Sequence, residues 1–273
     1  MTQASFLIGN LISNMNRSIV SPRIRRTFSS RALKTALVFA ACALLFPAAS
    51  NGGERRFVYS YETNTYVPGS IELENWLTWK DRDNGMGRFE FRHEVEFGIT
   101  EDFQLGLYLA DWRIDEGVGE SFHDFAIEGI YNLTNPYTDF IGSSLYGEVK
   151  FANEFLELEG KLLLQKNLGP VALVYNGIVE SEWEGDGLSE VTGVLEQTAG
   201  VSYQVSPSFL VGVEALAEVE IEDWQTAEDM AVFWGPNFSV RGGDHWFTAA
   251  GLWEMTSTGE PDFQLRMIWG IHL

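Results

Sequence analysis

Residues 209–221 read FLVGVEALAEVEI. Successive side chains of an extended strand point to opposite faces, so this stretch has one apolar face and one face that carries glutamates. A soluble sheet would turn the glutamates to water, whereas a membrane barrel would turn the apolar face to lipid and the glutamates to its interior. The stretch predicts an amphipathic β-strand. The rest of the chain has to decide between a soluble sheet and a membrane barrel.

The charge of the chain is concentrated after its first 50 residues. The protein has 273 residues, of which 45% are hydrophobic, and a formal charge of −21. Residues 1–50 contain six basic residues and no acidic one, so all 39 acidic residues lie in the remainder. Such an acidic chain lacks the basic footprint that nucleic acid requires. We therefore expect no nucleic-acid partner, and one large all-β domain is compatible with the length.

The amino-terminal region has the form of an export signal. Basic residues up to Lys34 precede the apolar run ALVFAACALLF (36–46) and the small residues PAAS (47–50), which is the order found in signal peptides. We predict a signal peptide over 1–50, an N-terminal segment over 51–69 and a β-barrel domain over 70–273. The stretch FVYSYETNTY (57–66) is compatible with an extra strand, a periplasmic extension or a partial plug.

Twelve stretches with alternating polarity follow one another along the barrel domain. They are 70–80, 87–99, 102–112, 122–133, 144–152, 156–166, 170–183, 190–205, 209–221, 230–240, 245–255 and 262–273. Most connections after even-numbered stretches are tight. Those after odd-numbered stretches tend to be longer and acidic, such as the loop around DEGVGE (115–120). This pattern is typical of an up-and-down outer-membrane barrel, so we predict an all-β, transmembrane, antiparallel barrel of about twelve strands, with ten or fourteen possible.

The charged residues of these stretches lie opposite the apolar ones. As lumen-lining residues we predict Glu72, Glu74, Glu90, Arg92, Glu94, Glu96, Glu128, Glu148, Lys150, Glu157, Glu159, Lys161, Glu180, Glu196, Glu214, Glu218 and Arg266. Acidic residues outnumber basic ones in this set, and carboxylate rings favour cations over anions. The alternative is that the carboxylates pair with the basic residues or face trapped water in a plugged lumen.

Aromatic residues gather at both ends of the predicted strands. Trp79, Trp112, Trp183 and Trp253 lie near the longer loops, and Phe97, Phe103, Tyr131, Tyr203 and Phe209 lie near the tight turns. Two aromatic girdles mark the interfaces of a membrane barrel, whereas a soluble sandwich would place tryptophan in mid-strand. We interpret these nine residues as interfacial, in contact with outer-membrane lipid.

Pro236 is an exception to the strand pattern. It lies inside the stretch 230–240, where proline removes one ladder hydrogen bond. Gly235 beside it favours a β-bulge at this point, and two shorter strands are the alternative.

No catalytic motif is present in the sequence. HExxH, GxSxG, GxGxxG and Walker patterns are absent, so we expect no enzymatic activity, no cofactor and no metal site. Acidic loop residues such as Asp81, Asp83, Glu184 and Asp186 do not follow the EF-hand spacing, and we interpret them as solvated.

The chain resembles a known family in several stretches. These are FVYSYETNTYVPGSIELENWLTW (57–79), FRHEVEFGITEDFQLGLYL (91–109) and KLLLQKNLGPVALVYN (161–176). They resemble the outer-membrane β-barrel family named for the MetA pathway of phenol degradation and related uncharacterised barrels. The terminal FQLRMIWGIHL (263–273) resembles the signal read by the barrel assembly machinery, with Leu273 in place of the usual terminal aromatic residue. The resemblance implies a fold and a location in the bacterial outer membrane, and no substrate.

Together these observations predict a passive outer-membrane channel or transporter for small solutes with a cation-preferring lumen. Two alternatives stay open. One is a non-transporting barrel with a structural or adhesive role, and the other is a soluble periplasmic β-protein.

Overall fold

The structure is a computed structural model, and it describes residues 55–81 and 87–273. The predicted signal peptide, residues 1–50, lies outside the described residues. The described part of the chain contains strands and turns and no helix. It accordingly has no helix long and apolar enough to span a membrane.

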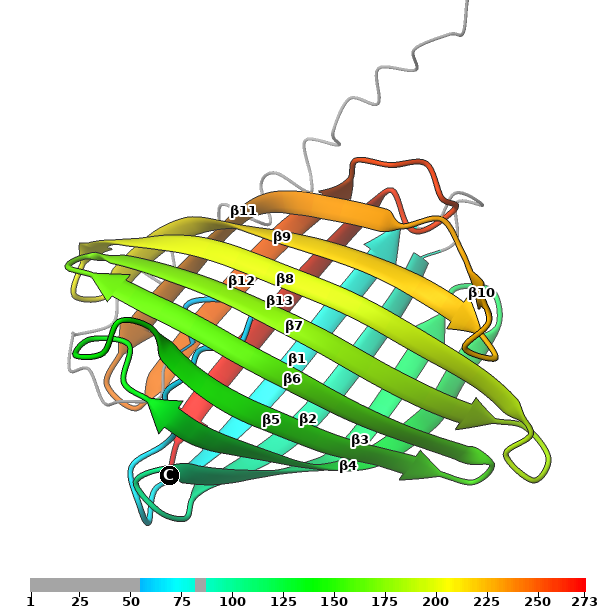
Figure 1. Cartoon of the computed structure of the whole chain (residues 1–273), viewed down its shortest axis with the longest axis horizontal. Coiled ribbons are helices and arrows are strands. Elements are labelled where there is room, and N and C mark those ends of the chain that lie inside the picture. Colours follow the sequence, from blue (N-terminus) through cyan, green and yellow to red (C-terminus); the bar gives the residue numbers. More distant parts are fainter. Residues whose placement is uncertain (1–54, 82–86) are drawn as a thin grey trace, which may run out of the picture. The chain divides into compact units, whose positions relative to one another are not determined.

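Thirteen strands of the described chain form one antiparallel sheet (Figure 1). They are β1 (Ile71–Asp81), β2 (Gly87–Gly98), β3 (Phe103–Asp115), β4 (Gly119–Thr134), β5 (Gly142–Ala152), β6 (Phe155–Leu168), β7 (Val171–Glu184), β8 (Glu190–Ser206), β9 (Phe209–Glu222), β10 (Thr226–Ala227), β11 (Ala231–Gly242), β12 (His245–Glu254) and β13 (Phe263–His272). β10 has two residues and pairs only with β9. The other twelve each pair with their neighbours in chain order, and β1 pairs with β13. The predicted closed, up-and-down barrel of twelve strands is confirmed.

The two ends of the barrel differ in what they carry. β1 begins and β13 ends at one end, here called the terminus end, where the turns 99–102, 135–141, 169–170, 207–208 and 243–244 also lie. The opposite, loop end carries 116–118, 153–154, 185–189, 223–230 and 255–262. The prediction of a long loop between the third and fourth strands is wrong. β3 and β4 extend to Asp115 and Gly119, so only three residues connect them.

The faces of the barrel follow the alternation of the strands. Exposed apolar side chains cover the outer wall, among them Leu109, Ile127, Leu145, Val149, Leu158, Leu162, Val179, Leu195, Val201 and Val213. Buried polar and charged side chains occupy the alternate positions of the same strands. A folded soluble protein rarely exposes such a continuous apolar surface. The outer wall therefore has the character of a lipid-facing surface.

The strand that contains Pro236 has no bulge. β11 pairs with β9 without interruption from Ala231 to Val240. Against β12 the pairing lapses at Gly235 and Pro236, yet the same register resumes at Asn237. The prediction of a bulge is wrong, because the strands keep the same register on both sides of the unpaired residues and no extra residue is inserted. Register shifts occur instead in other pairs, notably around Tyr108–Trp112 in β3.

Candidate functional site

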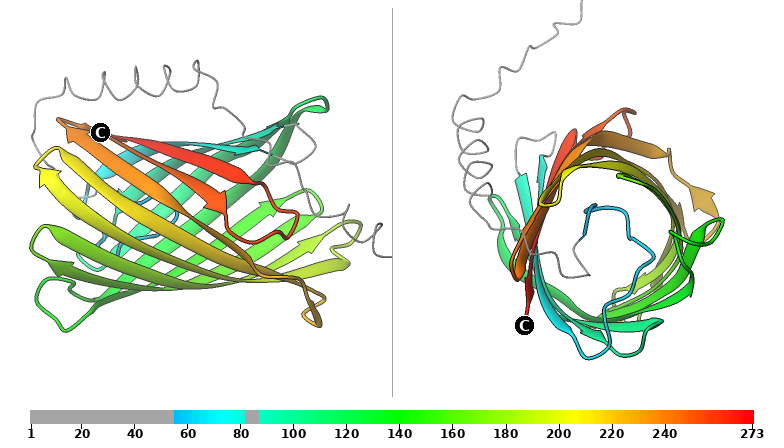
Figure 2. Two further views of the ribbon diagram at one scale, coloured as in Figure 1. Left: turned by 90° about the horizontal axis from the view of Figure 1, so that it is seen from above. Right: turned by 90° about the vertical axis from the view of Figure 1, so that its left-hand side faces the viewer.

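Residues 55–70 lie inside the barrel and form no strand (Figure 2). This stretch is here called the luminal segment. It contains the described part of the N-terminal segment predicted over 51–69, for which the sequence leaves open an extra strand, a periplasmic extension or a partial plug. Most of its bonded backbone groups meet inward-facing side chains rather than a strand edge. Of the alternatives drawn from the sequence, the segment has the position of a partial plug.

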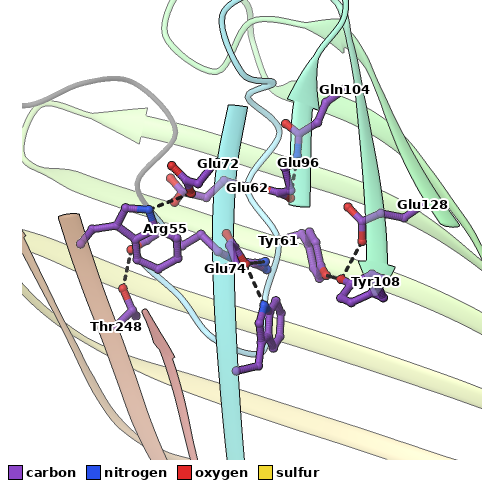
Figure 3. A network of polar contacts seen from close by, with 12 residues as sticks. Arg55, Tyr61, Glu62, Glu72, Glu74, Glu96, Gln104, Tyr108, Glu128 and Thr248 are labelled. Atoms are coloured by element: carbon purple, nitrogen blue, oxygen red, sulfur yellow. Dashed lines mark hydrogen bonds and ion pairs between the residues drawn. The ribbon is translucent and has the colours of Figure 1, made fainter. Parts of the chain in front are cut away.

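The luminal segment makes a circuit of the inner wall. From Tyr66 back to Arg55 it meets side chains of β3, then of β4, β5 and β6, then of β7, β9, β11 and β12. The Arg55 guanidinium then reaches Glu74 on β1 at 3.4 Å, which completes the turn. Figure 3 shows Arg55 between Glu74 and Thr248.

A belt of polar side chains fixes the segment at this level. Its members each bond a backbone group of residues 55–66, and they are Gln104, Asn132, Ser144, Gln165, Asn176, Glu214, Asn237, Ser239 and Thr248. Glu214 alone accepts the N–H groups of Val58, Tyr59 and Ser60 at 2.8–3.0 Å. Buried backbone groups need such partners because no water replaces them. Apart from Glu214, sequence analysis missed the belt because single uncharged polar residues on an inward face carry no signal.

The tyrosines of the luminal segment are buried among charges. Tyr61 lies between the Arg55 guanidinium, 4.1 Å from the ring centroid, and the Lys161 ammonium at 4.4 Å. Burial raises the pKa of Tyr59, Tyr61 and Tyr66 above the usual value, and neighbouring carboxylates raise it further. These phenols are therefore neutral at physiological pH.

The charged residues predicted for the lumen lie at inward-facing positions. Buried positions are Glu72, Glu74, Glu94, Glu96, Glu128, Glu148, Glu157, Glu159 and Glu214. Half-buried positions are Glu90, Arg92, Lys150, Lys161, Glu180, Glu196, Glu218 and Arg266. The barrel brings together residues far apart in sequence, for example Arg92 and Glu148 at 3.5 Å.

The register of the strands sets glutamates directly opposite one another. Glu72 pairs with Glu96, Glu128 with Glu148, Glu148 with Glu159, and Glu159 with Glu180, while Gly106 separates Glu96 from Glu128. We call these six glutamates the glutamate row. It starts near the terminus end of β1 and finishes near the loop end of β7. Like charges opposite one another destabilise a sheet, so nearby cations stabilise the row.

The protein supplies some of those cations itself. Lys150 forms ion pairs with Glu157 at 2.6 Å and Glu159 at 3.7 Å, and Lys161 with Glu159 at 2.5 Å. At the other end of the row, His272 lies 2.5 Å from Glu72. Arg92 and Lys150 also lie 3.5 Å and 3.9 Å from Glu148, so basic side chains accompany the row at Glu148 and Glu159.

A polar cavity of about 220 Å³ lies inside the barrel toward the loop end. Its lining consists of Trp76, Thr78, Glu90, Arg92, Asp111, Arg113, His123, Asp124, Lys150, Glu157, Glu182, Glu184 and Arg266. Sequence analysis missed Asp111, Arg113, His123 and Asp124. The register shifts in the β3–β4 pair invert the expected alternation there, so simple period-two counting assigns Asp111 and Arg113 to the wrong face.

The aromatic residues interpreted as interfacial lie on the outer face. Trp79, Trp112, Trp183 and Trp253 lie toward the loop end, and Phe97, Phe103, Tyr131, Tyr203 and Phe209 toward the terminus end. Trp112 stacks on Phe91 at 4.3 Å, and Trp79 meets Phe263 edge-on at 5.9 Å. Their contact with the membrane interfaces stays a prediction.

Comparison with known proteins gives a family. The model of a family of unknown function, DUF6662, matches residues 49–266. The chain belongs to this family. The family named for the MetA pathway is thus not the one matched, while the broader likeness to outer-membrane barrels is confirmed at the level of the fold. No curated protein matches the sequence.

Solved structures of outer-membrane channels share this fold. The COG4313 outer-membrane channel from Pseudomonas putida F1 has a TM-score of 0.58 at 10% identity, over 80% of this chain and 100% of that one. The NanC porin has a TM-score of 0.51 at 9% identity, over 74% of this chain and 100% of that one. At these identities the likeness concerns the fold alone.

Proposed function

We propose that this member of the DUF6662 family is an outer-membrane channel that passes small solutes and prefers cations. The glutamate row is the observation that carries the proposal, because it lines the inner wall from near one mouth to near the other. Carboxylates at a pore wall favour cations and repel anions. The apolar outer wall and the likeness to channel structures support the location.

The luminal segment sets the size of the solutes in this proposal. It runs around the wall at the level of the polar belt and occupies space that a twelve-stranded barrel would otherwise leave to water. Passage past it is restricted to small ions and solutes. Export under the leader 1–50 and insertion by the barrel assembly machinery through β13 belong to the same proposal.

A second candidate function is a barrel that does not conduct. The observation that favours it is the segment's attachment around the wall, including the three N–H groups held by Glu214. In that case the protein acts through its exposed loops or as a structural component of the membrane.

Single-channel recording of the refolded protein in a planar bilayer separates the two candidates. A channel gives steady current steps for the wild type. A permanently closed barrel gives none, and it begins to conduct only when Glu214→Ala releases the segment. Heat-modifiable migration on a denaturing gel establishes that each sample is folded. Silence from both folded proteins would reject the channel.

A further inference from the structure

Three carboxylates meet on the inner wall across β3. Glu94 and Glu96 belong to β2 and Glu128 to β4, and one oxygen of each lies within 4.8 Å of the other two. Two oxygens bound to one Ca²⁺ at 2.3–2.6 Å are separated by at most about 5 Å. The spacing therefore fits ligands of a single ion.

Gly106 on β3 provides the space in which these side chains meet. It pairs with Glu96 on one side and with Glu128 on the other. A Cβ atom at this position would lie 2.5 Å from Cγ of Glu128 and closer still to Oε1 of Glu94. Any other residue would push the carboxylates apart, so the glycine forms part of the arrangement.

Four of the six carboxylate oxygens have no hydrogen-bond partner among the residues that the structure describes. They are both oxygens of Glu94, Oε2 of Glu96 and Oε1 of Glu128. The side chain of Glu94 is fully buried. Buried charged groups are normally paired or bound to a metal, so four such oxygens at one place offer ligands for a cation.

The remaining two oxygens are oriented by neutral donors. Gln104 Nε2 donates to Glu96 Oε1 at 2.8 Å, and the Tyr108 hydroxyl donates to Glu128 Oε2 at 2.8 Å. The Tyr146 hydroxyl lies 2.8 Å from Glu128 Oε2 and equally close to Glu148 Oε2. Figure 3 shows Gln104 beside Glu96 and Tyr108 beside Glu128. Outer hydrogen bonds of this kind hold metal-binding carboxylates in place.

Two comparable carboxylate groups in the same barrel have their own cations. In the group Glu157, Glu159 and Glu180, Lys150 forms an ion pair with Glu157 and Lys161 forms one with Glu159. In the group Glu72, Glu74 and Glu96, Glu74 forms an ion pair with the Arg55 guanidinium at 3.4 Å. Within the described ranges, Glu94, Glu96 and Glu128 form no ion pair with a basic side chain.

We propose that Glu94, Glu96 and Glu128 bind one divalent cation of the calcium type on the inner wall. The donor set is oxygen only and carries three formal negative charges, which suits a hard cation rather than a thiophilic or imidazole-preferring metal. The site differs from the acidic loops considered in the sequence, and it does not depend on whether the barrel conducts.

Calcium binding to the refolded, chelator-treated full chain in detergent tests the proposal. Isothermal titration calorimetry measures affinity and stoichiometry, and terbium luminescence excited through nearby tyrosines reports the location. We expect one Ca²⁺ per chain. Since outer-sphere partners alone change affinity about 10–100-fold, Glu94→Gln should weaken binding at least tenfold.

Two further variants make the result specific. Gly106→Ala keeps every carboxylate and should also weaken binding at least tenfold, because it fills the space between them. Glu218→Gln removes an inward glutamate elsewhere on the wall and should leave affinity unchanged. Absence of binding to the folded wild type, or equal affinity in wild type and Gly106→Ala, would overturn the site.

Discussion

Oε2 of Glu214 accepts the backbone N–H of Tyr59 at 2.8 Å, although the two residues are 155 positions apart in the sequence. The same carboxylate accepts the N–H groups of Val58 and Ser60 and the amide of Asn237. One buried side chain of β9 thus ties the luminal segment to the barrel wall. Under the proposed function, the resistance of the lumen to passage depends on this attachment.

Glu214→Ala should loosen the luminal segment. A hydrogen bond to a charged group contributes about 1.5–3 kcal/mol, and the variant removes several of them. Amide exchange at residues 58–60 should accelerate at least tenfold, measured by hydrogen–deuterium exchange. Glu218→Ala, on the same face of the same strand, is the matched control. Unchanged protection in Glu214→Ala would show that the segment is held elsewhere.

Alkaline pH should weaken the folded state through the tyrosines of the luminal segment. Burial raises the pKa of Tyr59, Tyr61 and Tyr66 above the ordinary value of about 10. The unfolded chain therefore loses these protons first as pH rises, so the free energy of unfolding is unaffected below about pH 10 and falls above it. Absorbance of tyrosinate during a pH titration should show late-ionising phenols, and fewer of them in Tyr61→Phe. Ionisation of all phenols near pH 10 would contradict the burial.

Removal of Lys150 should destabilise the loop-end half of the lumen. Its ammonium lies 2.6 Å from Glu157, 3.7 Å from Glu159 and 3.9 Å from Glu148. Loss of one partner from a buried ion pair costs about 3–5 kcal/mol, so Lys150→Gln should lower the free energy of unfolding by that order. Urea unfolding followed by tryptophan fluorescence measures it. Lys166→Gln, which removes an ammonium that donates a solvent-exposed hydrogen bond to the carbonyl of Asp139 at the terminus end, should change stability by less than about 1 kcal/mol.

A charge in the middle of the outer wall should oppose insertion. Leu162 is exposed on that wall within β6. Arginine at the midplane of a membrane barrel costs about 2–4 kcal/mol, so Leu162→Arg should fold into lipid vesicles with a correspondingly lower stability. Thr138→Arg in the turn 135–141 should fold like the wild type. Equal stability of the two variants would argue against a membrane setting.

Much of the barrel could be predicted from the sequence, because the alternation of side chains that defines each strand lies within that strand. FLVGVEALAEVEI (209–221) is β9 to within one residue, and GRFEFRHEVEFGI (87–99) is β2 to within one residue, because most charged residues of each stretch fall on one face. The alternation also gave the inward face of both strands. Prediction failed at β3, where the register shift near Asp111 reverses the faces.

The candidate site could be predicted only in part. The alternation of side chains along a strand shows which glutamates face inward. The register between neighbouring strands decides which of them meet, and the sequence of a single strand does not encode that register. The approach of Glu94 to Glu128 across Gly106 is a property of three strands together. The course of the luminal segment was equally hidden, because its partners are distributed over most strands of the barrel.

The most direct test of the central claim is the reversal potential of the refolded protein in a planar bilayer under a salt gradient. We predict a cation-selective potential for the wild type that moves toward zero when Glu148→Gln and Glu180→Gln are combined, since both belong to the glutamate row. Glu228→Gln, in the exposed loop 223–230, should leave the potential unchanged. Anion selectivity, or a double variant as selective as the wild type, would contradict conduction along the row.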